Sequence, residues 1–133
     1  NKLRVGICGW GNVATGLFKT LQTNSVEIKK RSNLEIVIIA IGARRDNPKC
    51  DPDNVIIERD IFKIIDHDID VVVELIGGID VARDLILKAL NDKKHVVTAN
   101  KAVIFNHGDE LFSVANKNGV KLLYSLLFAQ AHQ

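Results

Sequence analysis

The sequence predicts an α/β domain with a doubly wound, mostly parallel β-sheet, and three observations support this fold class. An apolar run at residues 3–8 ends in a glycine-rich turn that leads directly into a helical stretch. Further apolar runs, at 34–43 and 69–76, are rich in β-branched residues, as strands buried on both faces are. Helical stretches alternate with these strands, which is typical of a parallel sheet with helices on both faces.

Length and composition are those of one globular domain. The chain has 133 residues, of which 47% are hydrophobic, enough for one core and too few for two full domains. The formal net charge is +2 with both signs interspersed, so charge indicates neither a nucleic-acid nor a membrane-surface partner. We expect a cytoplasmic protein, because no apolar stretch is long enough to cross a bilayer and the first residues lack a signal-peptide layout.

The turn after the first strand matches the dinucleotide-binding pattern G-x-G-x-x-G/A. Gly9 permits the tight turn, Gly11 lets a pyrophosphate approach the backbone, and Ala14 lets the helix lie close to the strand. The amide groups near Asn12 and Val13, at the positive end of the helix dipole, then face the phosphates. Trp10 is interpreted as a lid on this turn or as part of the packing. The pattern predicts a nucleotide site, with a turn that serves packing alone as the alternative.

The first helix is expected from residue 12, with Val13, Leu17, Leu21 and Ile28 facing the sheet. The later elements are a strand at 55–57, a short helix at 61–65, the strand at 69–76, a helix at 81–91, a strand at 95–98, a helix at 108–118 with Leu111, Phe112 and Ala115 on its apolar side, and a strand at 120–124. Ligands in such sheets bind beyond the carboxyl ends of the strands, which are here Gly9, Arg44, Gly77 and Asn100.

Two arginines follow the second strand, at the position that distinguishes NAD from NADP. An acidic residue there binds the ribose hydroxyls of NAD, whereas an arginine can accept the extra phosphate of NADP. Arg44 and Arg45 favour a 2′-phosphate by charge and by forked hydrogen bonds. The alternative is a solvated basic turn that Asp46 partly neutralises. NADP is the expected cofactor, and NAD or the use of both stays open.

Polar residues also follow the strand at 95–98, whose end is expected near the reactive ring of the cofactor. Lys101 could stabilise negative charge on a substrate oxygen or transfer a proton, and a lysine that only faces water is the alternative. Glu74 lies in an otherwise buried strand and is interpreted as a paired structural acid. The four histidines share no spacing with acids or cysteines, so no metal site is expected.

With these motifs the chain resembles the amino-terminal NAD(P)-binding domain of homoserine dehydrogenase, a Rossmann-type domain, particularly in its proteobacterial form. The matching segments are 5–16, 42–51, 70–78, the run Lys-His-Val-Val-Thr-Ala-Asn-Lys-Ala at 94–102, and the short pairs 107–108 and 119–120. The resemblance covers residues 3 to about 124, nearly all of the chain. The Val-Thr-Ala-Asn-Lys element is far more specific than the glycine turn. The resemblance implies an oxidoreductase that interconverts L-homoserine and L-aspartate 4-semialdehyde with NAD(P), on the route to threonine, isoleucine and methionine.

The resemblance also implies roles for individual residues. Lys101 is the catalytic residue, and in the family it works beside a second lysine and several acids of a following substrate domain. Arg44 and Arg45 lie at the adenosine ribose, and Thr98 lies beside the nicotinamide and the substrate. The full set of expected cofactor-binding residues is Gly9, Trp10, Gly11, Asn12, Val13, Ala14, Arg44, Arg45, Gly77, Gly78, Thr98, Asn100 and Lys101.

The sequence departs from this family at residue 125, where the family continues with Glu-Ala-Ser-Val and paired glycines. We therefore expect an NAD(P)-binding domain at 1–124 and an atypical tail at 125–133, cut short before the substrate domain and inactive alone. If exposed, Leu126, Leu127 and Phe128 would favour aggregation unless they fold back on the domain or enter a homodimer interface. The alternatives are a free-standing nucleotide-sensing module and a related dehydrogenase of another small aldehyde.

Overall fold

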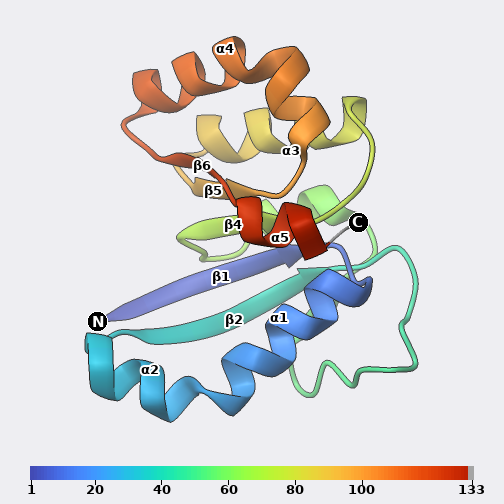
Figure 1. The fold of residues 1–133 in the computed structure, drawn as a ribbon, viewed down its shortest axis with the longest axis vertical. Coiled ribbons are helices and arrows are strands. Elements are labelled where there is room, and N and C mark those ends of the chain that lie inside the picture. The colour runs from blue at the N-terminus through green and yellow to red at the C-terminus, as the bar shows by residue number, and fades with distance from the viewer. Residues whose placement is uncertain (132–133) are drawn as a thin grey trace.

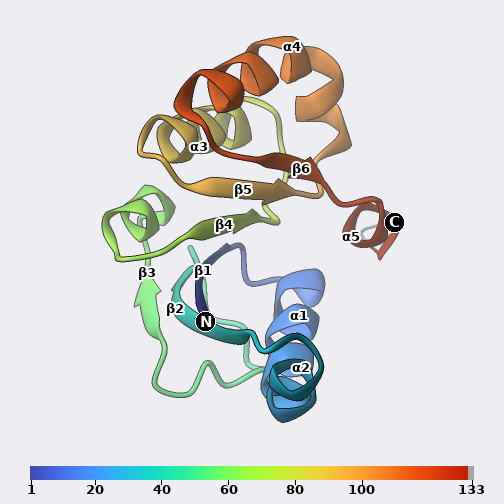
Figure 2. The same cartoon turned by 90° about the vertical axis from the view of Figure 1, so that its left-hand side faces the viewer.

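A computed structural model describes residues 1–131 as an all-parallel, six-stranded sheet with helices on both faces (Figures 1 and 2). The strands are β1 (Lys2–Cys8), β2 (Glu35–Gly42), β3 (Ile56–Glu58), β4 (Val71–Glu74), β5 (His95–Thr98) and β6 (Leu122–Tyr124). Their order is β3-β2-β1-β4-β5-β6, and every neighbouring pair is parallel. The predicted Rossmann-type fold class is confirmed.

The helices lie on opposite faces of the sheet. The helices α1 (Asn12–Thr23) and α2 (Ser25–Ser32) cover β1 and β2 on one side (Figure 2). The 3₁₀ helix η1 (Ile61–Asp66), α3 (Asp80–Asn91) and α4 (Lys101–Asn118) lie on the other side. Right-handed crossovers that run in opposite directions along a sheet place their helices on opposite faces. The strand order reverses between β1 and β4: the connection after β1 leads toward β2, and the connection after β4 leads the opposite way, toward β5.

Strand β4 shows why the predicted strands are continuous apolar runs. Val72 belongs to the core beneath α3 and α4, whereas Val71 and Val73 belong to the core beneath α1. Successive side chains of a strand point to opposite faces, so a strand buried on both faces needs apolar residues at every position. The core beneath α3 and α4 contains the fully buried Leu85, Ile86, Leu90 and Leu111.

The first helical stretch is two helices, so the prediction that one helix extends to Ile28 is wrong. Helix α1 ends at Thr23, and the backbone and side-chain amides of Asn24 both donate to the carbonyl of Thr20. These bonds satisfy the end of α1 and allow α2 to start in a new direction. The most buried side chains of α1 are Ala14, Thr15 and Phe18, and the predicted inward residues Val13, Leu17 and Leu21 are only partly buried.

The sequence analysis predicted that this helix begins near Gly108, but helix α4 begins seven residues earlier, at Lys101. The Asn100 side chain accepts from the Val103 amide at 3.0 Å and caps the helix at its earlier start. Gly108 lies buried inside the helix, where tertiary packing outweighs its poor helix propensity. Phe112, predicted on the apolar side, is 45% exposed.

The residues after β6 form a short helix, α5 (Leu126–Ala131). Phe128 packs against the core beneath α1, whereas Leu126 and Leu127 are exposed. The tail therefore folds back through one aromatic side chain and leaves two leucines in solvent. No helix within residues 1–131 is long and apolar enough to cross a membrane.

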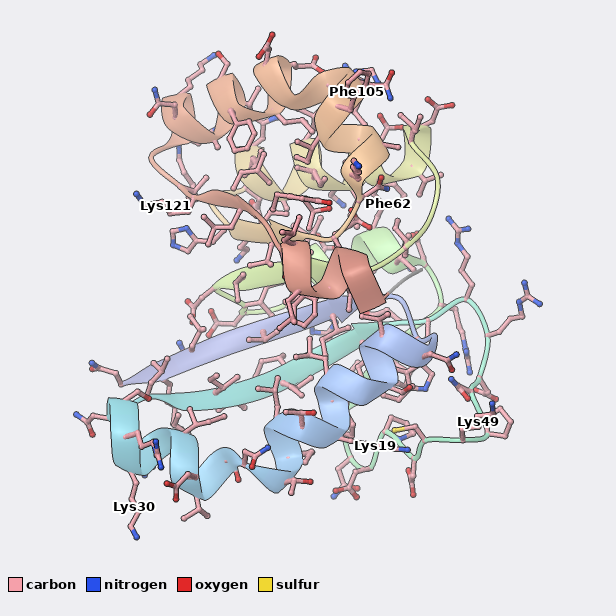
Figure 3. All side chains as sticks on the ribbon, viewed as in Figure 1. Lys19, Lys30, Lys49, Phe62, Phe105 and Lys121 are labelled. Atoms are coloured by element: carbon pink, nitrogen blue, oxygen red, sulfur yellow. The ribbon has the colours of Figure 1, made fainter. Side chains whose placement is uncertain are left out.

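The packing of α3 gives a first testable prediction. Leu85→Ala should lower the free energy of unfolding by about 2–5 kcal/mol, because the leucine is fully buried and its removal leaves a cavity. Phe105→Ala is the control, since Phe105 is 86% exposed on the outside of α4 (Figure 3) and its loss should change that energy by less than about 0.5 kcal/mol. Urea titration followed by circular dichroism measures both, and equal effects would contradict this description of the core.

Candidate cofactor-binding site

A cleft of about 460 Å³ opens where β1, β2 and β4 end, at the reversal of the strand order. Clefts at this point of an open α/β sheet are the usual ligand sites of the fold. Six of the predicted cofactor-binding residues line it: Gly9, Trp10, Gly11, Arg44, Arg45 and Gly77. The cleft also contains residues that sequence reasoning missed, among them Asn47, Ile61 and Ile76.

The turn at Gly9 is fastened to both neighbouring strands. The Gly9 amide donates to the Gly42 carbonyl and the Leu75 amide donates to the Cys8 carbonyl, each at 2.8 Å. Gly9 has a φ of +115°, and a Cβ atom there would lie 2.8 Å from the Leu75 carbonyl oxygen. Only glycine combines this conformation with this approach.

The start of α1 is open toward the cleft. Gly11 is the N-cap, no side chain caps the helix, and no acidic residue occupies its first turn. A Cβ atom on Gly11 would meet nothing within 4 Å. The amide groups of the first turn have no partners within their own helix, so they can donate to an external anion. Asn12 and Val13 lie in this turn, and Ala14 is buried against the core, as close packing of helix and strand requires.

Trp10 is 9% exposed, and its ring packs edge-on against Phe18 with 5.4 Å between the ring centroids. The indole therefore belongs to the packing beneath the turn, and Trp10 is also one of the residues that line the cleft. The Asn47 side-chain amide donates to the Trp10 carbonyl at 3.0 Å and ties the loop after β2 to the glycine turn. The signal in the sequence for this loop is the Asn-Pro pair, which marks a turn but not its partner.

The loop after β2 is also held by side chains from α1 and from the segment that follows β3. Lys19 of α1 donates to the Lys49 carbonyl at 3.2 Å (Figure 3). Arg59, beyond β3, forms an ion pair with Asp46 and donates to the Ala43 carbonyl at 3.1 Å. The loop that carries the two predicted arginines is thus fixed by contacts with the glycine turn, with α1 and with the segment after β3.

Arg44 and Arg45 are exposed at the rim of the cleft. Neither forms an ion pair with any residue that the structure describes, because Asp46 is paired with Arg59. The alternative interpretation, in which Asp46 partly neutralises this turn, is not what the structure shows, because the charge of Asp46 is directed to Arg59. The two free guanidinium groups leave positive charge at the end of β2, where it can attract an anionic ligand.

The remaining predicted residues lie beside the cleft and not in its wall. Asn100 donates to the Gly78 carbonyl at 2.5 Å, which joins the loops that follow β4 and β5. Thr98 is fully buried, and its hydroxyl donates to Glu74 at 2.5 Å. Lys101 is exposed as the first residue of α4. The structure thus places Thr98 beneath the surface of the site and Lys101 on it.

Other chemistry-bearing residues do not add a second centre to this edge. Both cysteines are buried free thiols, and burial together with the nearby Glu74 carboxylate raises the pKa of the Cys8 thiol. His67 bonds to Glu58 at 2.7 Å, and His95 accepts from the Lys121 amide at 3.0 Å. Over the described part of the chain, no three His, Cys, Asp or Glu side chains are grouped as metal ligands.

Comparison with known proteins agrees with this geometry. Residues 9–125 match the family model described as homoserine dehydrogenase, NAD binding domain. The homoserine dehydrogenase of Pseudomonas aeruginosa is 48% identical over 128 residues, which are 96% of this chain and 30% of that protein. The enzyme of Synechocystis is 41% identical over 91% of this chain and 28% of its own length.

Solved structures give the same result. The crystal structure of a homoserine dehydrogenase from Thiobacillus denitrificans superposes with a TM-score of 0.86 at 35% identity, over 93% of this chain and 29% of that one. A homoserine dehydrogenase of Staphylococcus aureus at pH 7.5 superposes with a TM-score of 0.85 at 34% identity, over 94% and 33%.

The chain therefore spans less than a third of the length of the curated relatives named above. The matched region contains the glycine turn, the arginine loop and the start of α4. Fold, cleft and relatives lead to one conclusion: the chain belongs to the homoserine dehydrogenase family and corresponds to its NAD-binding domain.

Proposed function

We propose that this chain binds NAD(P) in the cleft between β1, β2 and β4, as the cofactor-binding part of an enzyme that interconverts L-homoserine and L-aspartate 4-semialdehyde. The observation that carries the proposal is the uncapped start of α1, whose N-cap residue Gly11 lines a cleft at the reversal of the strand order. The reaction belongs, in this proposal, to the cytoplasmic route to threonine, isoleucine and methionine.

The residues present fit a dinucleotide. Space for a diphosphate exists at Gly11, where a Cβ atom would meet nothing, and the amides of Asn12 and Val13 supply donors without a competing side chain. Gly77 bounds the cleft toward β4, and Asn100 fixes the adjacent Gly78. The two halves of the sheet each accept one half of a dinucleotide, with the adenosine over β2 and the nicotinamide over β4 and β5.

Lys101 is the residue we propose to contact the substrate. An ammonium group at this edge can bind the substrate oxygen and stabilise negative charge that develops there. When bound, the nicotinamide ring carries the hydride. Holding the substrate in a reactive geometry requires further residues, which we assign to the part of the enzyme that relatives have beyond this region. Residues 1–124 are then the cofactor domain and 125–133 a separate tail.

We further propose that the site prefers NADP to NAD. Arg44 and Arg45 lie at the end of β2, and Asp46 is engaged by Arg59 and does not neutralise them. Free guanidinium groups at this position can form charge-assisted bonds to a 2′-phosphate, which NAD lacks.

Cofactor binding is tested with a matched pair of glycine variants. Gly11→Ala should weaken NADPH binding by about tenfold, because its methyl group occupies the space of the phosphates. Gly16→Ala should leave binding unchanged, since Gly16 lies farther along α1 and a Cβ there also meets nothing within 4 Å. Titration followed by Trp10 fluorescence measures both. Wild-type protein that shows no saturable binding would refute the proposal.

The NADP preference is tested at the arginine loop. Arg44→Ala should weaken NADPH binding by about 1–3 kcal/mol more than NADH binding, because only NADPH loses a charge-assisted contact. Arg31→Ala is the control, since Arg31 pairs with Glu27 on α2, away from the cleft. An equal loss for both nucleotides in Arg44→Ala would remove the basis for the preference.

A turnover assay separates the enzyme part from a nucleotide-sensing module. The purified 133-residue chain should bind NADP without forming NADPH from L-homoserine, because we assign the residues that hold the substrate to the part of the relatives beyond this region. Activity should appear when the same domain is fused to the remainder of a relative such as the Pseudomonas aeruginosa enzyme. A fusion that binds NADP and folds, yet lacks activity, would favour the sensing module. NADPH production is followed by its absorbance.

A further inference from the structure

A hydrogen-bonded circuit, here called the Glu74 circuit, connects the ends of β4 and β5. It consists of the side chains of Glu74, Thr98 and Asn100 together with the carbonyl of Gly78. Glu74 accepts from the Thr98 hydroxyl at 2.5 Å and from the Ile76 amide at 2.8 Å. The Thr98 hydroxyl in turn accepts from the backbone amide of Asn100 at 3.0 Å. The Asn100 side chain closes the circuit by donating to the Gly78 carbonyl at 2.5 Å.

The circuit extends into the start of α4. The second polar atom of the Asn100 side chain, Oδ1, accepts from the Val103 amide at 3.0 Å. Asn100 therefore contacts the loop after β4 through its nitrogen and the first turn of α4 through its oxygen. Lys101 follows Asn100 directly as the first residue of α4. The bonds that hold Asn100 therefore also fix the backbone position of Lys101.

Glu74 is the anchor of this arrangement. It is fully buried, and a buried carboxylate is costly unless it is paired and hydrogen-bonded. A buried acceptor of this strength fixes the donors around it, because any other orientation leaves a polar group unsatisfied. Among the described residues, no buried side-chain nitrogen or oxygen lacks a partner. The Glu74 side chain bonds to Thr98 on the neighbouring strand β5 and to the Ile76 amide just after its own strand β4. These side-chain bonds are additional to the backbone hydrogen bonds that pair the strands.

We propose that Glu74 is a positioning residue, which acts through Thr98 and Asn100 to hold Lys101 and the Gly77-Gly78 turn in one fixed relation. Its effect falls on the nicotinamide half of the site, over β4 and β5. The adenosine half depends on Gly11 and the arginine loop, which lie on other elements. The inference rests on the proposed function only for the identity of the ligand, and the circuit itself is testable without one.

The first test needs no nucleotide. Thr98→Val keeps the shape of the side chain and removes both hydroxyl bonds, so the Asn100 and Val103 amides should exchange with solvent about tenfold faster. Thr98→Ser restores the hydroxyl and should restore slow exchange. Thr20→Val, on the exposed side of α1, is the matched control and should change neither amide. Unchanged exchange at Asn100 and Val103 in Thr98→Val would overturn the proposal.

The second test compares two ligands. NADPH occupies both halves of the site, whereas 2′,5′-ADP occupies only the adenosine half. Thr98→Val and Glu74→Gln should each weaken NADPH binding by about tenfold and leave 2′,5′-ADP binding within about twofold of the wild type. Thr98→Ser should bind both as the wild type does. Equal weakening of the two ligands, or weakening of neither, would overturn the proposal.

The two tests distinguish a failure of the inference from a failure of the proposed function. Wild-type protein that binds neither ligand would refute the cofactor site, and amide exchange alone would then decide whether Glu74 organises the start of α4. If Glu74→Gln fails to fold, the comparison of Thr98→Val with Thr98→Ser decides whether the circuit positions the site, because valine preserves the volume of the side chain.

Discussion

The close approach of β1 to β4 at Gly9 is the constraint on which this site depends. A Cβ atom at Gly9 would lie 2.8 Å from the Leu75 carbonyl, and amides on each side bind the turn to β2 and to β4. This contact brings the end of β1 and the loop after β4 together at the reversal of the strand order. Without it α1 would not start at the carboxyl edge, and its open first turn would face no cleft.

The two helices that start at this edge differ in N-terminal capping, because α4 has a capping side chain and α1 has none. The start of α4 is closed by the chain itself, because Asn100 caps it and is held by Thr98 and Gly78. The start of α1 has a glycine N-cap and no capping side chain. A capped helix start supplies rigidity, whereas an uncapped one supplies hydrogen-bond donors for an anion. In the proposed function, phosphate binding and positioning are thus divided between α1 and α4.

Charge in the loop after β2 is determined by ion pairing. Asp46 follows Arg44 and Arg45 directly in the sequence, so local reasoning assigns its charge to them. In the fold it is paired with Arg59, which comes from beyond β3 and also binds the Ala43 carbonyl. This pairing shapes the loop and leaves the two arginines at the rim without an acidic partner. The same pairing fixes the loop to a third element, which local sequence gives no reason to expect.

The fold class and the glycine turn could be predicted from the sequence because they follow from local rules: β-branched runs buried on both faces, amphipathic stretches between them, and a glycine spacing that only one kind of turn requires. The early start of α4, the break after Thr23 and the exposure of Phe112 could not, since capping bonds and packing partners outweigh propensity there. The roles of Asn47 and Arg59 also needed the tertiary structure, as did the partners of Glu74, whose pairing the sequence indicates. Each acts on a residue brought near by strand pairing or loop packing, and sequence spacing carries no record of such a contact.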